Sequence, residues 1–260
     1  MPDPELLLQR LDQIGASLET LPAALALIAL GSTGQEQQRL DPYSDLDFFV
    51  LVAPGAKNAF IHNLGWLSAA CPIAYHFQNT PDGYKLLFAD GVFCEFAVFE
   101  PAELTTVPFV PGRVAWKRPE VDPDICIPAA KTTPPAPRPL DWLLGEALTN
   151  LYVGLCRFQR GERLSAARFI QGYAIDRLVE LSTFIEKPQL IPPDPFTPER
   201  RCEQRCPLLA QELPELIQGY ARSPHSARAI LAYLERHFSL DPAMKGAILA
   251  LCAPDLPPPE

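Results

Sequence analysis

Two aspartates, Asp45 and Asp47, stand at the head of an otherwise apolar run, residues 46–52. Alternation along a β-strand puts residues i and i+2 on one face, so the two carboxylates would share a site. At about 4 Å and an effective dielectric near 20, two like charges repel by roughly 4 kcal/mol. A cation bound between them would offset that repulsion. The alternative is that both acids only occupy the turn before the strand.

A break follows the preceding apolar run, residues 25–30, at Gly31 and Ser32. A turn between a strand and a short helix offers backbone N–H groups and a hydroxyl to phosphate oxygens, although Ser32 could also act only as a helix cap. Magnesium takes carboxylate and phosphate oxygens together, and two such ions would stabilise an in-line phosphoryl displacement. The turn and the pair Asp45 and Asp47 therefore form a candidate site for magnesium and a phosphate.

A third carboxylate, Glu95, interrupts the hydrophobic segment VFCEFAVF, residues 92–99. A charge in a buried strand needs a partner, so Glu95 is the candidate third metal ligand. Its neighbours Phe93 and Ala97 do not prove that this face is buried. A glutamate that faces solvent is the alternative.

The composition favours a soluble globular protein of one large or two small domains. The chain has 260 residues, of which 48% are hydrophobic and 20% charged. No apolar run reaches the length of a spanning helix, and the N-terminus lacks the basic region of a secretory signal, so a cytoplasmic location without membrane contact is expected. The net charge of -9 disfavours a nucleic-acid partner, because that affinity rests on Lys and Arg, and suits a cationic small molecule better.

Seven scattered cysteines do not form a disulfide framework in a chain of this size, and free thiols are expected. Cys202 and Cys206 could belong to a zinc site, but no second Cys or His pair lies near them in the sequence. Helical spacing explains the two cysteines equally well.

The chain changes character in its middle. The first half predicts helices at 5–18 and 58–70, a helical turn at 35–38, and strands at 25–30, 45–52, 73–77, 84–88 and 92–99, the last two joined as a hairpin at Asp90-Gly91. Residues 119–139 are too rich in proline for a helix or central strand and indicate an extended linker. Helical periodicity follows at 142–159, 164–185, 208–220, 227–238 and 242–251.

The spacing of Gly31-Ser32, Asp45-Leu46-Asp47 and Glu95 resembles the active-site signature of the polymerase-beta-type nucleotidyltransferase superfamily. The words YSDLDFFV, GEALTNLYVGLCRFQRGE and FTPERRCEQRCP are similar to lincosamide nucleotidyltransferases and, more distantly, to aminoglycoside nucleotidyltransferases. The resemblance implies an α+β protein. It would have an N-terminal mixed-sheet catalytic domain at 1–118, the proline-rich linker at 119–139 and a helical substrate-binding domain at 140–255.

That resemblance implies magnesium-dependent transfer of a nucleoside monophosphate from a nucleoside triphosphate to a hydroxyl of a small molecule, such as an aminoglycoside- or lincosamide-like antibiotic. Gln35 and Glu36 stand where a basic residue is expected to meet phosphate, and Arg39 is the candidate substitute. The implied metal ligands are Asp45, Asp47 and Glu95, and the implied triphosphate-binding residues are Gly31, Ser32, Arg39 and Ser44.

The helical half contributes one further candidate. By the resemblance, a carboxylate there deprotonates the acceptor hydroxyl, and Glu146, on one helix face with Asn150 and Val153, is the expected base. A solvated helix acid is the alternative. Trp142 and Tyr152 could line a substrate pocket or belong to the core.

Three arginines, Arg200, Arg201 and Arg205, could reach phosphates. The alternative is that they pair with Glu199 and Glu203.

Two other functions stay open at this point. One is a protein that keeps the fold and binds or senses a nucleotide without transferring it, and the other is nucleotidylation of a protein or of a tRNA end. The expected partners are a nucleoside triphosphate and a small hydroxylated acceptor, bound in a cleft between the two halves. The sequence leaves both a monomer and a homodimer possible.

Overall fold

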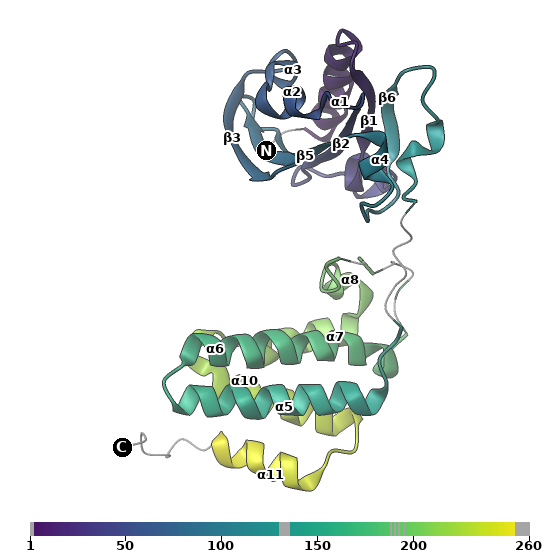
Figure 1. The fold of residues 1–260 in the computed structure, drawn as a ribbon. Helices are drawn as coiled ribbons and strands as arrows, with labels where there is room; N and C mark the ends of the chain where they lie inside the picture. The colour runs from purple at the N-terminus through teal and green to yellow at the C-terminus, as the bar shows by residue number, and fades with distance from the viewer. Residues whose placement is uncertain are drawn as a thin grey trace. The chain divides into compact units, whose positions relative to one another are not determined.

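The computed structural model describes residues 3–252 except 130–135, 188, 190, 192 and 195, and the chain divides into two compact units, residues 1–133 and 134–260 (Figure 1). The first unit is built on a six-stranded mixed sheet and the second is helical, which confirms the predicted α+β class. Among the described helices, none is long and apolar enough to cross a membrane.

The sheet has the strand order β3-β4-β5-β2-β1-β6, in which β2 and β5 run parallel and all other neighbours run antiparallel. The strands are β1 Ala24–Ala29, β2 Leu46–Val52, β3 Ile73–Thr80, β4 Gly83–Phe88, β5 Phe93–Phe99 and β6 Arg113–Lys117. Five of them lie where the sequence predicts strands. The sixth, β6, was not predicted and forms by pairing along β1.

One long helix precedes the sheet, and short helices and turns connect or follow its strands. They are α1 Pro4–Glu19, α2 Lys57–His62, α3 Gly65–Ser68 and α4 Pro101–Leu104, with 3₁₀ turns η1 Gly31–Thr33, η2 Gln37–Arg39 and η3 Pro123–Cys126. The single helix predicted at 58–70 is wrong, because the chain breaks between α2 and α3. There the side chain of Asn63 accepts a hydrogen bond from the Gly65 amide at 2.9 Å.

The main core of the unit lies on one face of the sheet, under α1, α2 and α3 (Figure 1). Leu46, Phe48 and Val50 of β2 point into it and are fully buried. The intervening residues point to the opposite face, where a smaller apolar cluster around Leu51 and Phe109 covers part of the sheet. Asp47 alternates with the buried residues Leu46 and Phe48, so its side chain points to this opposite face. It lies at the start of β2 and is half-buried.

Part of the predicted linker packs against the sheet unit. Val121, Ile125 and Cys126 contact the smaller apolar cluster, and the Gly112 amide donates to the Cys126 carbonyl at 2.9 Å. Residues 130–135 of the linker lie outside the described part of the chain. The division into 1–118, 119–139 and 140–255 stays a prediction.

The second unit is arranged around α5, which packs against α6, α7, α10 and α11. Its elements are α5 Leu140–Gln159, α6 Arg163–Arg168, η4 Phe169–Tyr173, α7 Ala174–Ile185, α8 Cys202–Arg205, α9 Pro207–Leu216, η5 Tyr220–Arg222, α10 Ser223–His237 and α11 Pro242–Leu251. The helix predicted at 164–185 is present as the continuous series α6, η4 and α7, with a widened turn at η4.

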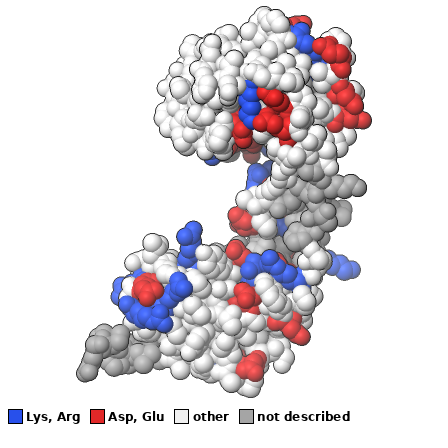
Figure 2. Space-filling view, in the orientation of Figure 1, with Lys and Arg blue, Asp and Glu red and all other residues white. Residues whose placement is uncertain are grey.

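Basic and acidic side chains lie next to one another on the visible face of both units (Figure 2). The ion pairs explain part of this pattern in the sheet unit, where Lys57 contacts Asp82 at 2.7 Å and Glu103 at 2.6 Å. Partial burial acts to raise the pKa of Glu103, but the hydrogen bonds that its carboxylate accepts from the Glu100 amide and from Lys57, together with the charge of Lys57, lower it. These charges therefore support the local fold rather than a separate binding surface.

Candidate active site

The turn η1 places Gly31 directly beside the carboxylate of Asp47. Gly31 has φ of 53°, in the left-handed region that favours glycine. A Cβ at this position would lie 3.7 Å from Oδ2 of Asp47. The Leu30 amide also donates to the Asp47 carbonyl at 2.8 Å, which joins the end of β1 to the start of β2.

The parallel pairing of β2 with β5 brings the carboxylate of Glu95 to the site. In that register Asp47 lies opposite Glu95, between the buried pairs Leu46 with Cys94 and Phe48 with Phe96. Residues paired in register point to the same face of a sheet. The fold therefore brings Asp47, Glu95 and the Gly31 turn together at one end of one sheet face.

Asp45 lies one residue before β2 and is exposed. Its charge acts on the same neighbour as that of Asp47, the buried thiol of Cys94. Burial, followed by the charges of Asp47 and Asp45, raises the pKa of Cys94 well above its usual range. Both aspartates thus lie close to the start of β5, and burial favours the neutral thiol of Cys94.

Glu95 has two direct partners on neighbouring strands. Its Oε2 lies 3.0 Å from the ammonium of Lys85 on β4, and its Oε1 accepts a hydrogen bond of 2.9 Å from the Asn79 side-chain amide on β3. The Glu95 side chain is about 41% exposed, so it belongs neither to the core nor to a fully solvated face. Lys85 and Asn79 were not identified from the sequence. The hairpin at Asp90-Gly91 sets the pairing of Lys85 with Glu95 and was a signal that could have found the lysine.

The residue types at this end of the sheet fit a magnesium ion. Asp45, Asp47 and Glu95 supply hard carboxylate oxygens, which magnesium prefers. Within the described residues, however, no group of three or more His, Cys, Asp or Glu side chains is gathered closely enough to hold an ion. One of the three carboxylates, that of Glu95, is instead paired with the ammonium of Lys85.

The predicted phosphate-binding residues have local partners. Arg39 forms an ion pair with Glu36, three residues earlier. The Ser44 hydroxyl is part of the turn before β2, where it accepts from the Asp41 amide at 3.0 Å and donates to the Asp41 carboxylate at 3.1 Å. The assignment of Arg39 and Ser44 to phosphate binding stays a prediction.

The basic side chain that contacts the η1 turn is one that the sequence did not identify. The Arg113 guanidinium, on β6, donates to the Thr33 carbonyl at 3.0 and 3.3 Å. Gln35 donates its side-chain amide to the Gly112 carbonyl at 3.0 Å. Gln35 and Arg113 thus tie the turn to the unpredicted strand, which explains a neutral Gln35 in structural terms.

In the helical unit, Glu146 lies half-buried on α5. Within the described residues its carboxylate has no hydrogen bond or ion pair, whereas its backbone carbonyl accepts from the Thr149 hydroxyl at 3.2 Å. An acid without a local partner fits a base more readily than an acid held in a salt bridge. The assignment of Glu146 as the base stays a prediction.

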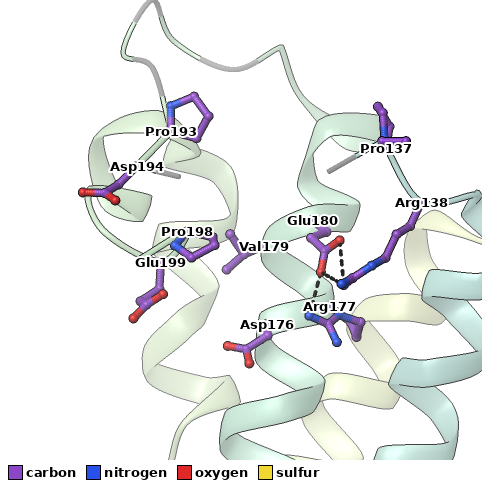
Figure 3. Close-up of a pocket in the computed structure, with 11 residues that line it drawn as sticks. Pro137, Arg138, Asp176, Arg177, Val179, Glu180, Pro193, Asp194, Pro198 and Glu199 are labelled. Carbon is purple, nitrogen blue, oxygen red and sulfur yellow. Dashed lines mark hydrogen bonds and ion pairs between the residues drawn. The ribbon is translucent and has the colours of Figure 1, made fainter. Parts of the chain in front are cut away.

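A separate pocket of about 460 Å³ lies in the helical unit, and its lining combines residues of α7 with Pro193, Asp194, Pro198 and Glu199 (Figure 3). Arg138 and Arg177 both contact Glu180, at 2.9 and 2.7 Å, and both guanidinium groups lie over the ring of Trp142. Trp142 therefore supports one wall of the pocket rather than the core.

Three further acids, Asp176, Asp194 and Glu199, also line this pocket (Figure 3). Loss of hydration raises the pKa of Asp176, and the negative charges of Glu199 and Glu180 raise it further, against the opposing charge of Arg177. The residue as a whole is nevertheless exposed, so we expect this shift to have a modest effect.

In the segment 200–205, Arg200 and Arg205 have local partners that differ from the predicted ones. Arg200 pairs with Asp194 at 3.0 Å rather than with Glu199 or Glu203. Arg205 is buried and donates to the backbone carbonyls of Pro198 and Arg200, so it holds the loop together.

The cysteines of the same segment are buried free thiols. Burial raises the pKa of Cys202 to about 11, with the nearby Cys206 as a second cause. The Cys206 sulfur lies 3.1 Å from the Ser182 hydroxyl. Both cysteines therefore act as small core residues.

No protein-family model and no curated protein sequence matches this chain. Among solved structures, an aminoglycoside 6-adenyltransferase from Bacillus subtilis aligns at 12% identity and a TM-score of 0.31, over 99% of this chain and 94% of its own. A STING-associated CdnE c-di-GMP synthase from Capnocytophaga granulosa aligns at 12% identity and a TM-score of 0.32, over 96% of this chain and 79% of its own. Similarity at this level carries no argument about the chemistry of this chain.

Proposed function

We propose that this chain is a magnesium-dependent nucleotidyltransferase that transfers a nucleoside monophosphate from a nucleoside triphosphate to a hydroxyl of a small molecule. The observation that carries the proposal is the pairing of Asp47 with Glu95 across β2 and β5, directly beside the Gly31 turn. Two strand carboxylates and a glycine turn at one sheet end supply oxygen ligands and a place for phosphate in the same site.

Each residue has a definite task in this proposal. Asp45, Asp47 and Glu95 would hold the magnesium, which when bound neutralises charge on the phosphates and supports an in-line displacement. Gly31 permits close approach because it has no side chain facing Asp47, and the amide and hydroxyl of Ser32 are available to the triphosphate.

The bond changes balance without any further reactant. The acceptor oxygen forms a bond to the α-phosphorus, the bond from that phosphorus to the pyrophosphate oxygen breaks, and the acceptor proton leaves to a base. Glu146 is the proposed base, because its carboxylate has no partner within the described residues. Substrates proposed for this reaction are aminoglycoside- or lincosamide-like antibiotics, and the reaction would take place in the cytoplasm.

The direct experiment is mass spectrometry of hydroxylated acceptors after incubation with the protein, magnesium and each nucleoside triphosphate. The panel contains aminoglycosides and lincosamides. The expected product is an acceptor heavier by one nucleoside monophosphate, formed together with pyrophosphate and only when magnesium is present. The Asp47→Asn variant is the matched control.

A protein that binds a nucleotide without transferring it is the second candidate. It is favoured by the contacts of Glu95 with Lys85 and Asn79, because a Glu95 carboxylate engaged by these two residues is less available to a metal ion. Magnesium-dependent nucleotide binding without pyrophosphate release, across the whole acceptor panel, would identify this case.

A further inference from the structure

The sheet face that carries Asp47 and Glu95 continues into an exposed aromatic surface. In the antiparallel registers Tyr75 of β3 lies opposite Leu87 of β4, and Leu87 lies opposite Phe93 of β5. Tyr75 is 57% exposed and Phe93 38% exposed. A row of large apolar side chains thus crosses three neighbouring strands without being covered within its unit.

This row, Tyr75–Leu87–Phe93, lies next to the charged row of the candidate active site. Lys85 and Glu95 stand two residues from Leu87 and Phe93 on the same strands, so they point to the same face. Two residues along a strand correspond to about 7 Å, the width of an aromatic ring with its contacts. A molecule held at Glu95 would therefore extend directly onto the apolar row.

The strand order indicates which of the two substrates, the nucleotide or the acceptor, would reach that row. Across the sheet the η1 turn after β1 comes first, then Asp47 on β2 and Glu95 on β5, followed in the same register by Lys85 on β4 and Phe77 on β3. The apolar row lies on β5, β4 and β3, two residues along these strands. If the pyrophosphate is held at the turn and the α-phosphorus at the carboxylates, an in-line attack requires the acceptor oxygen on the side opposite the turn. The apolar row lies on that side, next to Lys85 and Phe77.

The charges on this surface limit the chemistry of the acceptor. The apolar row contains no charged side chain, and the two charged groups that border it on β4 and β5, the Lys85 ammonium and the Glu95 carboxylate, are paired with each other at 3.0 Å. A polycation would meet that ammonium at close range and would gain no carboxylate from the row itself. An uncharged molecule with a flat apolar face would instead bury the rings and leave its hydroxyl near Glu95.

We propose that Tyr75, Leu87 and Phe93 form the acceptor-binding platform, and that the acceptor is an uncharged hydroxylated molecule with an aromatic or flat apolar face. The proposal rests on the function proposed above and narrows its substrate class. It disfavours polycationic amino sugars, which the acidic net charge of the whole chain would otherwise suggest.

Two neutral glycosides that differ only in one ring can test the platform. Binding of 4-nitrophenyl β-D-glucoside and of methyl β-D-glucoside is measured by calorimetry on the full chain, with magnesium and a non-hydrolysable nucleoside triphosphate analogue present. Kanamycin serves as the polycationic probe. We expect the nitrophenyl glycoside to bind about tenfold more tightly than the methyl glycoside, and kanamycin to bind more weakly than the nitrophenyl glycoside.

The decisive variant combines Tyr75→Ser with Phe93→Ser, and Tyr220→Ser is the matched control, because Tyr220 is 55% exposed in the helical unit. The double variant should lose the preference for the ring, while the control keeps it. Tighter binding of kanamycin, or an unchanged ring preference in the double variant, would overturn the platform.

Two additional readouts distinguish an acceptor platform from a site for the nucleotide base and from a surface for self-association. If the double variant weakens the nucleotide analogue and not the glycoside, the platform holds the base of the nucleotide and the proposal is wrong. If it alters self-association in sedimentation, the row is an interface between copies and the proposal is equally wrong. Magnesium-dependent binding of the analogue to the unmodified chain is measured separately, so failure of the platform and failure of the proposed function are distinguishable.

Discussion

The ammonium of Lys85 lies 3.0 Å from Oε2 of Glu95, and the two residues are paired across β4 and β5 on the face that also carries Asp47. A cation from the chain itself therefore neutralises the third carboxylate of the candidate site. Any metal ion that takes Glu95 as a ligand must replace this contact. Lys85 thereby competes with the metal for the same oxygen.

Lys85→Met should strengthen divalent-metal binding in the absence of nucleotide by up to about fivefold, since a partly exposed ion pair is worth up to roughly 1 kcal/mol. The melting temperature should change little, because both side chains are about 40% exposed. Titration with Mn²⁺ followed by electron paramagnetic resonance measures the affinity. Lys245→Met, which removes an ion pair with Glu235 in the helical unit, is the control. Equal affinities in all three proteins would show that Glu95 is not a metal ligand.

Gly31→Ala should impair both the turn and the site. Its φ of 53° costs a residue with a side chain about 1–2 kcal/mol, and the added Cβ lies 3.7 Å from Oδ2 of Asp47. Gly55→Ala is a matched control, because Gly55 has φ of 81° and open space at its Cβ position. Chemical denaturation should show similar losses of stability, whereas calorimetry should show weaker nucleotide binding only for Gly31→Ala. Equal nucleotide affinity in both variants would remove the turn from the site.

Glu146→Gln should reduce turnover by about 10² to 10⁴, the range usual for a general base, with little change in nucleotide binding. The substitution keeps the size of the side chain and removes its basicity. Asp141→Asn, an exposed acid in the first turn of the same helix, serves as the control. Near-normal turnover of Glu146→Gln with its acceptor would assign proton removal to Asp45, Asp47 or a metal-bound hydroxide.

Asp176→Asn should stabilise the protein slightly at neutral pH. Because the pKa of Asp176 is raised in the folded state, the folded chain loses that proton less readily than the unfolded chain does. Stability is therefore lost as the pH rises from the unfolded pKa, about 3.9, through the raised folded value, and the loss is complete above both. Thermal melts should show the gain at pH 7 and its disappearance near pH 4. A gain that is independent of pH would contradict this origin.

The positions of Asp47 and Glu95 were predictable because each interrupts a regular apolar strand. The hairpin at Asp90-Gly91 was also predictable, and it determines the pairing of Lys85 with Glu95. Lys85 was not predicted, because its partner Glu95 lies across the hairpin and not near it in the sequence.

Other features depend on distant segments and left no local signal. The strand β6 is short and forms by pairing with β1, more than 80 residues earlier, for example Arg113 with Ala29. The pocket in the helical unit combines residues of α7 with Pro193, Asp194, Pro198 and Glu199 from later in the chain. Periodicity predicts α7 itself but not which loop covers it.

Asp47→Asn should abolish transfer and leave the fold intact, since it removes a metal ligand and also the repulsion from Asp45. The melting temperature should be unchanged or slightly higher. Circular dichroism checks the fold, so a loss of activity can be assigned to the site.

The most direct measurement is magnesium-dependent pyrophosphate release from each nucleoside triphosphate, in the presence of the acceptor panel, for the wild-type chain and for Asp47→Asn. We predict release by the wild-type chain with at least one nucleotide and acceptor, its loss on chelation of magnesium, and its absence in Asp47→Asn. Magnesium-dependent nucleotide binding without pyrophosphate release, or equal release by both proteins, would contradict nucleotidyl transfer at this site.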